Sequence, residues 1–396
     1  MQTNILHWRV YFAVGNGTIL LKNGTLIDGT GRAPIHNVTI EVIHGRFGSI
    51  TQYDAGNQTI NENVQEIDLN GLVILPGFIH AHAHTSFKYL QNEPLHGYHK
   101  EYLAACLKEG ITTIRDEGMT TNATIDDVIT HTNGLDPLSF PRIITSGKVF
   151  TAPGGYGGQE PIGVGSAEEA RLKVREVLTQ GVHFIKTALE DGYDPSTFGM
   201  PKLNQEVLEA ICREAGEMGA YVSAHVTSAH NLQILVNAGI NDAAHMIYDR
   251  LDDSLIRQMN DKNIRIIPTL TVLQMFQDKF GAPLLAQGMD NVRRFVEAGG
   301  EIGLGDDFVE EESPWYRLGM PWEEIRLLGE TGLTPMQIIT AATLNGAKIC
   351  NLSHELGTVE TGKKADLFVI DGDPLHDINN LRKVKFVMKD GNLLFP

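Results

Sequence analysis

Cysteine is scarce in this sequence, and the few cysteines form no recognisable pattern. The chain of 396 residues contains three, which lie far apart at Cys106, Cys212 and Cys350. No Cys-x-x-Cys spacing occurs, so a cysteine-rich zinc module and a disulfide-stapled secreted scaffold are both excluded. An odd number of distant cysteines fits a reducing compartment, and we therefore expect a cytoplasmic protein.

Basic residues and long apolar segments are also scarce. Lysine and arginine number 32 against 49 aspartate and glutamate residues, which gives a formal net charge of −17. Nucleic acids and anionic membranes select basic surfaces, so neither is expected as a partner. No apolar run reaches the roughly 20 residues that a membrane-spanning helix needs. Polar residues interrupt the moderately apolar stretch 5–14, so no signal peptide is expected either.

What the sequence does contain is a pair of histidines at the end of an apolar stretch. His82 and His84 follow residues 75–79, whose apolar and turn-forming side chains predict a buried strand that runs into its exit loop. Residues two apart on a strand point to the same face. Two neutral imidazoles on one face can bind one divalent metal ion, so this strand end predicts a place for metal-dependent chemistry.

Several later β-rich segments also end in residues that can bind a metal ion. Helix-like stretches separate these segments, and repeated strand–helix units predict a parallel sheet with right-handed crossovers. Functional residues at the C-terminal ends of several strands are typical of a (β/α)8 barrel. We therefore predict an α/β protein of that barrel class. In chain order, the candidate residues are Lys186, His225, His245, Asp306 and Asp307.

The expected strands and helices fill the middle of the chain, whereas both ends read as all-β. Turn residues recur about every eight to twelve positions in 18–70 and 357–396, which indicates short strands. Neither end alone would bury a core, so we expect the two to form one module. The barrel strands are predicted near 72–79, 111–117, 142–147, 183–188, 221–226, 241–246, 264–270 and 302–306. The helices are predicted near 97–109, 124–132, 166–180, 204–218, 228–238, 252–261, 284–299, 321–331 and 335–350.

The ordered motifs together resemble the amidohydrolase superfamily, and within it the branch related to prolidase and imidazolonepropionase. The resemblance covers nearly the whole chain. It rests on His-x-His after Leu-Pro-Gly, on the later Lys, His, His and Asp, and on segments 21–29, 110–116 and 362–367. It implies a (β/α)8 TIM barrel at 71–351 beside a small β-sandwich built from residues 1–70 and 352–396. Acidic barrels of this family often form dimers or larger rings, so a homo-oligomer is an open alternative.

The resemblance also implies a binuclear metal centre, with zinc as the expected metal. One ion would lie between the His-x-His pair and an aspartate, and the second would lie between the two later histidines. A lysine ammonium has no lone pair for a metal. This branch, however, carries a lysine carbamylated by CO2, whose two oxygens can bridge two ions. The implied ligands are His82, His84, Lys186, His225, His245 and Asp307.

Two of these assignments depend on the alignment with the family pattern. The family motif at the last strand resembles Gly-Thr-Asp, and alignment of Gly305 with its glycine assigns the essential role to Asp307 rather than Asp306. The pattern usually has an aspartate where this chain has His80. We therefore assign His80 to hydrogen bonding around the metal and the substrate rather than to metal ligation.

The implied activity is hydrolysis of an amide bond in a small molecule, such as a dipeptide or an N-acyl amino acid. Two metal ions would lower the pKa of a bound water, so that hydroxide exists near neutral pH. Asp307 would accept the proton of the attacking water and then give it to the leaving nitrogen. Tyr156, in the glycine-rich loop 151–158, and Arg317 are candidates for substrate binding. Both are equally compatible with packing on the rim.

The acidic residues after the fourth and eighth predicted strands can be interpreted in two ways. They favour a substrate with a cationic group, or they form an ordinary solvated face of an acidic protein. Prolidase-like relatives often carry a histidine at the position of Tyr156, which argues against strict specificity for Xaa-Pro dipeptides. The acidic residues are Glu190, Asp191, Asp194, Glu310, Glu311 and Glu312.

Other functions remain as alternatives on the same fold. A deaminase resembles a mononuclear pattern without the bridging lysine and with a glutamate three residues after the fifth-strand histidine. This chain has Ser228 at that position and retains Lys186, and both features oppose deamination. A hydrolase of a carbamate, urea, ester or lactone would use the same centre. A non-catalytic scaffold is disfavoured, because such a chain would be expected to have lost ligands.

Overall fold

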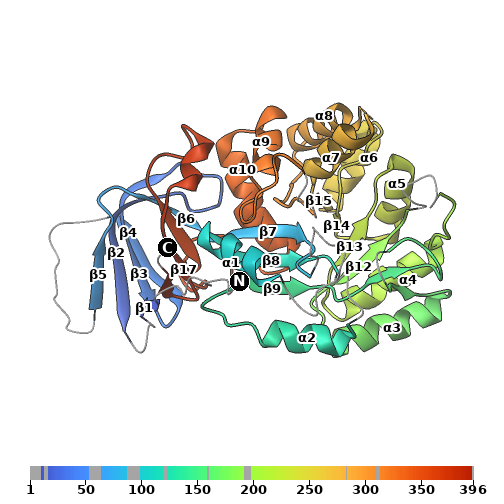
Figure 1. Cartoon of the computed structure of the whole chain (residues 1–396), viewed down its shortest axis with the longest axis horizontal. Coiled ribbons are helices and arrows are strands. Elements are labelled where there is room, and N and C mark those ends of the chain that lie inside the picture. The colour runs from blue at the N-terminus through green and yellow to red at the C-terminus, as the bar shows by residue number, and fades with distance from the viewer. Residues whose placement is uncertain are drawn as a thin grey trace, which may run out of the picture.

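The computed structural model has two parts, a large β-sheet and a set of strands that helices cover (Figure 1). The described residues are 17–52, 64–86, 99–118, 123–157, 160–190, 198–281, 283–307 and 313–394, together with the backbone of 10–12. Of the acidic candidates, Asp191, Asp194 and residues 310–312 lie outside these ranges. None of the helices in the described ranges is both long and apolar enough to cross a membrane.

Both ends of the chain contribute strands to one nine-stranded sheet, so the terminal segments do meet. The order is β1–β18–β17–β16–β6–β2–β3–β4, with β5 paired to β2. The N-terminal strands are β1 (Val10–Phe12), β2 (Thr18–Leu26), β3 (Ile35–Ile43), β4 (Arg46–Gln52), β5 (Val64–Asp68) and β6 (Val73–Pro76). The C-terminal strands are β16 (Leu367–Ile370), β17 (Val384–Lys389) and β18 (Asn392–Leu394). The β-sandwich form of this module and its exact limits stay predictions.

A single glycine connects this sheet to the strand that carries the His-x-His pair. The strand β6 pairs with β2 and β16, and β7 (Phe78–Ala83) begins two residues after β6 ends. Between them lies Gly77, where an added Cβ would stand 2.2 Å from the hydroxyl oxygen of Thr112. No larger residue fits there without a shift of the neighbouring strand, so the close connection depends on glycine.

The second part contains a series of short parallel strands whose pairing continues from β7 around to residue 307. The strands β7, β8 (Ile111–Asp116) and β9 (Arg142–Thr145) form one sheet. The strands β12 (Ile185–Ala188), β13 (Val222–His225), β14 (Asp242–Ala243) and β15 (Arg265–Ile266) lie in another, to which β10 (Val149–Thr151) and β11 (Ile162–Gly163) add.

Isolated contacts join the ends of these two sheets. The amide of His183 donates to the carbonyl of Thr145 at 3.0 Å, Ile266 bridges to Ile302, and Ala83 bridges to Asp307. These contacts are consistent with the expected (β/α)8 barrel.

Helices flank the parallel strands, and most of them begin near the predicted positions. Side-chain caps explain several starts: Thr124, Ser166, Asn204 and Ser228 each accept a hydrogen bond from a backbone amide of the first turn. The helices are α1 (Lys100–Lys108), α2 (Ile125–Asn133), α3 (Ala167–Thr179), α4 (Gln205–Glu217), α5 (Ala229–Ala238), α6 (Asp253–Asp261), α7 (Leu270–Phe280), α8 (Leu284–Glu297), α9 (Trp322–Glu330), α10 (Pro335–Thr340) and α11 (Gly346–Ile349).

Several elements differ from the sequence-based expectation. The segment expected as a strand at 302–306 forms only isolated bridges, at Ile302 and Asp307, and the strand expected at 241–246 is limited to Asp242–Ala243. The strand expected at 264–270 is only two residues long, because the chain turns at Pro268 and Thr269 and starts α7 at Leu270. The helix expected at 335–350 is interrupted by a five-residue π-helical segment, Ala341–Asn345. There Asn345 donates its amide to the carbonyl of Ile302, 3.0 Å away, which ties this helix to the end of the strand series.

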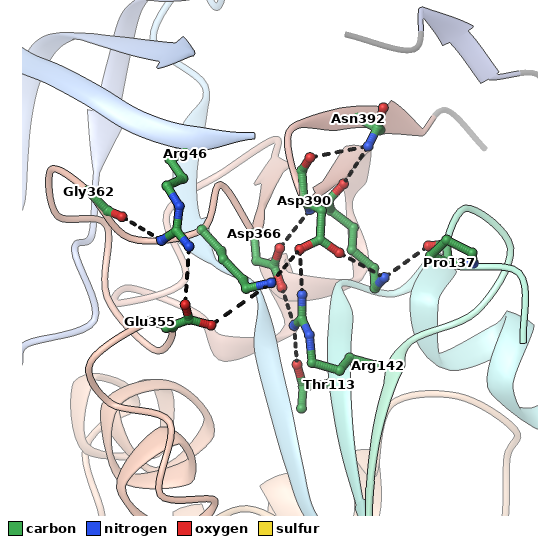
Figure 2. A network of polar contacts seen from close by, with 11 residues as sticks. Arg46, Thr113, Pro137, Arg142, Glu355, Gly362, Asp366, Asp390 and Asn392 are labelled. Atoms are coloured by element: carbon green, nitrogen blue, oxygen red, sulfur yellow. Dashed lines mark hydrogen bonds and ion pairs between the residues drawn. The ribbon is translucent and has the colours of Figure 1, made fainter. Parts of the chain in front are cut away.

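A network of charged side chains joins the two parts of the molecule (Figure 2). Arg142, the first residue of β9, donates to Asp366 at 2.8 Å and to Asp390 at 2.6 Å. Its Nη1 also reaches the hydroxyl of Thr113 at 3.0 Å. Because Asp366 and Asp390 belong to the C-terminal part of the large sheet, one guanidinium connects that sheet to the parallel strands. Asp366 is only 4% exposed, so loss of Arg142 would leave a buried carboxylate without this partner.

We expect Arg142→Ala to lower the free energy of unfolding by about 2–3 kcal/mol, because hydrogen bonds between charged groups contribute more than neutral ones. Urea denaturation of the purified protein would measure the change. The matched control is Lys173→Ala, which removes an exposed ion pair to Glu176 and is expected to change stability by less than about 1 kcal/mol. Equal losses in the two variants would contradict a special role for Arg142.

Candidate active site

The two histidines of the His-x-His motif converge on one carboxylate. His82 lies on β7 and His84 directly follows it, and their Nε2 atoms stand 3.0 and 3.1 Å from the same oxygen, Oδ1 of Asp307. The three side chains offer ligand atoms that lie within 4.8 Å of one another. We call these three residues the HxH–Asp cluster. It is the arrangement expected for a divalent ion held by two imidazoles and one carboxylate.

The backbone around Asp307 brings its carboxylate to the histidines. The amide of Asp307 donates to the carbonyl of His82 at 3.0 Å. Two residues earlier, Gly305 packs so closely that an added Cβ would lie 2.7 Å from the backbone nitrogen of His82. Asp307 itself has a φ of 63°, which is the left-handed region that aspartate tolerates better than most residues. Gly305 and the left-handed backbone of Asp307 together let residues 305–307 pack against β7.

Contacts with the neighbouring histidines favour the ionised form of Asp307. Burial alone would raise the pKa of this carboxyl, but His82, His84 and His245 outweigh burial and hold the pKa well below its ordinary value. His82 shows the opposite behaviour, since burial and the nearby Lys186 lower its pKa. The imidazole of His82 is therefore neutral, with a lone pair available for a metal ion.

A second pair of histidines lies beside the HxH–Asp cluster. The rings of His225, at the end of β13, and His245, just after β14, have centroids 4.5 Å apart, and His245 lies 4.9 Å from the ring of His82. Burial and Lys186 lower the pKa of His225 to about 3. Burial and His225 hold the pKa of His245 well below its ordinary value. Both rings are therefore neutral, which is the form that binds metal.

Neighbouring groups fix the orientation of two of the four rings. His84 Nδ1 lies 2.8 Å from the carbonyl of Gly118, so Nδ1 donates to that carbonyl and Nε2 is the atom that faces Asp307. Burial lowers the pKa of His84, but the hydrogen bond to Asp307 outweighs burial and raises it. His245 Nδ1 lies 2.8 Å from the hydroxyl of Thr269. Thr269 precedes α7 with a φ of 44° and gives that helix no side-chain cap. Contacts of this kind orient metal ligands and tune their affinity.

Glu324 of α9 caps α7 in place of Thr269. Its carboxylate accepts from the amides of Leu270 and Thr271 at 3.0 and 2.9 Å. Burial raises the pKa of Glu324 to about 8, and these amide bonds offset only part of that effect. The Thr269 hydroxyl is thus left for His245, which ties the start of α7 to the candidate site.

The residues present fit a divalent metal ion. His82 is fully buried; its Nδ1 has no hydrogen-bond partner among the described residues, and its Nε2 faces Oδ1 of Asp307. An unsatisfied buried imidazole is costly unless another group uses it. A cation held between His82, His84 and Asp307 would use this ring and would also offset the charge of the buried carboxylate.

Lys186 lies in the same region, and its ammonium group forms an ion pair. It lies on β12 with its Nζ 2.8 Å from Oε2 of Glu117, and it is one of the cationic groups that lower the pKa of His82, His225 and His245. Burial raises the pKa of Glu117, but Arg115 and Lys186 lower it to about 2. Sequence reasoning missed Glu117. The available signal was the run of three charged residues, Arg115 to Glu117, at the end of a buried strand.

His80 and Asp306 form a pair next to the HxH–Asp cluster. Nε2 of the fully buried His80 lies 2.8 Å from Oδ1 of Asp306. Asp306 therefore faces His80, whereas Asp307 faces the two candidate ligands. The contacts agree with the expected roles, in which Asp307 is the essential aspartate and His80 is a hydrogen-bonding residue, and both roles stay predictions.

The two candidate substrate-binding residues are placed differently. The ring centroid of Tyr156 lies 4.9 Å from that of His225. Burial raises the pKa of its phenol, and Asp307 and Glu190 add to that rise. Arg317 is exposed, and its contacts in the described residues are with carbonyls of its own loop, at Pro314 and Tyr316. The structure thus brings Tyr156 to the histidines, and no described contact does the same for Arg317.

Comparisons with known proteins identify the family. The model of the amidohydrolase family matches residues 73–394, so the chain belongs to the amidohydrolase family and is a hydrolase of carbon–nitrogen bonds. An imidazolonepropionase from Thermoplasma volcanium is 22% identical over 400 residues, which cover 91% of each chain.

Two solved structures share the fold over nearly the whole chain. A Xaa-Pro dipeptidase with methionine bound in its active site has a TM-score of 0.80 and 24% identity, and the match covers 96% of this chain and 100% of that one. A protein from Bifidobacterium longum described as a candidate prolidase has a TM-score of 0.79 and 28% identity, with 96% and 95% covered.

Proposed function

We propose that this protein is a binuclear metal-dependent amidohydrolase that cleaves an amide bond of a small molecule such as a dipeptide or an N-acyl amino acid. The observation that carries the proposal is the convergence of His82, His84 and Asp307 beside the second pair, His225 and His245. We place this centre at the C-terminal ends of the strands of a (β/α)8 barrel formed by residues 71–351. Residues 1–70 and 352–396 would form the accompanying β-sandwich.

The proposed centre holds two divalent ions, with zinc as the expected metal. The HxH–Asp cluster would hold one ion, His225 and His245 would hold the other, and Lys186 carbamylated by CO2 would bridge them. When bound, the two ions would supply an activated water and polarise the substrate carbonyl. All four histidines and one carboxylate are donors of the type that zinc prefers.

Asp307 performs the proton transfers in this proposal. Its carboxylate is ionised, because the surrounding imidazoles hold its pKa well below the ordinary value. The ionised carboxylate would accept the proton of the attacking water, and the same carboxyl group would then deliver that proton to the nitrogen that leaves. Amide cleavage needs this delivery, since an unprotonated amide nitrogen is a poor leaving group.

The wall of the site next to His225 supports a substrate that carries an ammonium group. Glu190 lies two residues after Ala188, which pairs with His225, and is only 5% exposed. Its carboxylate accepts a hydrogen bond from the hydroxyl of Thr227, two residues after His225. A buried carboxylate there is not part of a solvated acidic face. It suits a cationic group such as the free amino group of a dipeptide, and the dipeptidase with bound methionine supports the same substrate class.

Amine release from a panel of dipeptides, N-acyl amino acids and small cyclic amides tests the proposal. The assay would be run on protein loaded with zinc in the presence of bicarbonate. We expect turnover of at least one amide, and faster turnover of substrates with a free amino group than of their N-acetylated forms, because Glu190 faces that side of the site. The control is the same protein stripped with a chelator, which should be inactive and regain activity with zinc.

Inactivity on every amide, in protein shown to hold two metal ions per chain, would contradict the proposal. It would redirect the search to esters, lactones, carbamates and ureas. Release of ammonia from a substrate with an exocyclic amine, without amide cleavage, would instead establish a deaminase.

A further inference from the structure

Four buried charged side chains lie in a row next to the proposed metal centre. Asp242 on β14 accepts two hydrogen bonds from the guanidinium of Arg115, both at 3.0 Å. Arg115 also donates to Oε1 of Glu117 at 2.7 Å, and Lys186 donates to Oε2 of Glu117 at 2.8 Å. None of the four residues is more than 2% exposed. We call this set the buried charge row.

Burial of four charged side chains in a protein interior is energetically unfavourable. Removing charges from water carries a penalty of several kcal/mol per ion, and well-packed apolar residues of similar size often give a more stable protein. Arg115 is held further by the ring of Phe184, whose centroid lies 3.9 Å from the guanidinium carbon. The fixed end of the row is therefore Arg115 with Asp242, and the end that reaches the proposed metal centre is Lys186.

Glu117 connects that lysine to the strand of the metal ligands. It follows β8, and its amide donates to the carbonyl of Ala83, at 2.9 Å, between His82 and His84. Lys186 lies on β12, two residues before the residue that pairs with His225. Glu117 thus contacts the strand of the first histidine pair through its backbone amide and the lysine on the strand beside the second pair through its carboxylate.

We propose that Glu117 is a positioning residue that holds Nζ of Lys186, so that the carbamate formed there directs its two oxygens toward the two metal sites. This inference rests on the proposed function. Carbamylation converts R–NH3+ and CO2 into R–NH–COO− and two protons, so the carbamate nitrogen keeps one hydrogen. That hydrogen continues to donate to Oε2 of Glu117, while Arg115 remains bound to Oε1.

The charge of the row explains why the carbamate should depend on metal. With an unmodified lysine, two cations and two carboxylates cancel. Carbamylation changes Lys186 from a cation to an anion, which leaves the row with two excess negative charges in a buried place. Two divalent cations supply the missing positive charge, so the modification is expected in the metal-loaded protein and not after chelation.

The experiment compares two neutral substitutions at Glu117, one that keeps a hydrogen-bond acceptor and one that does not. Glu117→Gln keeps a side-chain oxygen that can accept from Nζ, whereas Glu117→Leu removes it. A third variant, Glu214→Gln, changes another buried glutamate, which is 2% exposed and pairs with Arg175 between α3 and α4. Each protein would be loaded with zinc and 13C-labelled bicarbonate. The readouts are the carbamate carbon signal by NMR and the affinity for the second zinc by competition with a chelating dye.

We expect the native protein, Glu214→Gln and Glu117→Gln to show one carbamate and two zinc ions per chain. Glu117→Leu should lose the carbamate signal and bind the second zinc about 10–100-fold more weakly, the usual effect of removing a group that orients a metal ligand. Circular dichroism would confirm that each variant is folded. If Glu117→Leu does not fold, Glu117→Gln still tests the inference. Loss of the carbamate signal or weaker binding of the second zinc in Glu117→Gln would contradict it.

Other outcomes separate this inference from the proposed function. A native carbamate that persists in folded Glu117→Leu with unchanged zinc affinity would overturn the positioning role and leave the binuclear centre intact. Equal losses of the carbamate signal and of zinc affinity in Glu117→Gln and Glu117→Leu would overturn the hydrogen-bond argument, because the negative charge of Glu117 and not its acceptor oxygen would then be the property that matters. A native protein that hydrolyses amides without any carbamate would overturn the lysine bridge and this inference with it.

Discussion

The Asp307→Asn variant is expected to hydrolyse amides about 10³–10⁴-fold more slowly than the native protein, which is the upper range for loss of a general acid–base group. Asparagine has the same shape and keeps one oxygen toward His82 and His84, so the fold should remain. It cannot accept a proton from water or deliver one to a leaving nitrogen. Steady-state rates on an amide identified from the substrate panel would measure the loss, with metal content determined on the same preparation.

Asp306→Asn is the matched control for this prediction. Asp306 faces His80 rather than the HxH–Asp cluster, so its replacement should cost far less activity than replacement of Asp307. An ester analogue of the best amide gives a second comparison, because an alkoxide leaves with less need for a proton than an amide nitrogen does. The rate loss of Asp307→Asn should therefore be smaller for the ester. A larger loss at Asp306 than at Asp307 would reverse the assignment.

The convergence at Asp307 could be predicted from the sequence because it follows from strand geometry. Alternation places His82 and His84 on one face, and parallel strands with their C-terminal ends at one edge bring distant ligands together. The choice of Asp307 over Asp306 came from alignment of a three-residue motif, and the structure places the two side chains on different partners. Local periodicity and family spacing were sufficient to predict that these side chains meet, whereas their catalytic roles stay predictions.

The partners of the ligands could not be predicted in the same way. Thr269 reaches His245, and Glu117 reaches Lys186, only because the chain turns unexpectedly at Thr269 and because a charged triplet is buried at the end of β8. Charged residues at a strand end ordinarily indicate a solvated loop. Their burial depends on contacts with Asp242, 127 residues away from Arg115 in the chain. A buried charge whose partner lies so far away in the chain produces no recognisable pattern in a short window of sequence.

The fold shows the same division between local and distant effects. Helix starts at Thr124, Ser166, Asn204 and Ser228 follow from capping residues within a few positions, and they lie close to the predicted ones. The expected strand near 264–270 was too long, because a glutamate on α9 stabilises a helix that begins at Leu270. Neighbouring sequence favoured an apolar strand there, and a buried carboxylate from another element determined the outcome.

Lys186→Ala is expected to reduce amide hydrolysis by at least about 10²–10³-fold, the cost of removing one electrostatic group that acts on the transition state. Without the lysine the proposed carbamate could not form, and an ion at His225 and His245 would keep only those two imidazoles. The variant should therefore also bind about one zinc per chain instead of two. Elemental analysis and steady-state rates on the same preparation would measure both effects.

Small carboxylic acids should partly restore the Lys186→Ala variant. Truncation of a buried lysine would leave a cavity beside the proposed metal sites, and formate, acetate or propionate would offer the same two oxygens as the proposed carbamate. The matched control is Lys389→Ala, which removes another buried lysine, one that contacts Pro137 and Asp390 at the junction of the two parts. That variant should be less stable but should keep two zinc ions and show no response to carboxylic acids.

Native activity in Lys186→Ala would refute the bridge. Restoration by chloride as readily as by acetate would show that the cavity needs only a negative charge, and the argument for a two-oxygen ligand would fail.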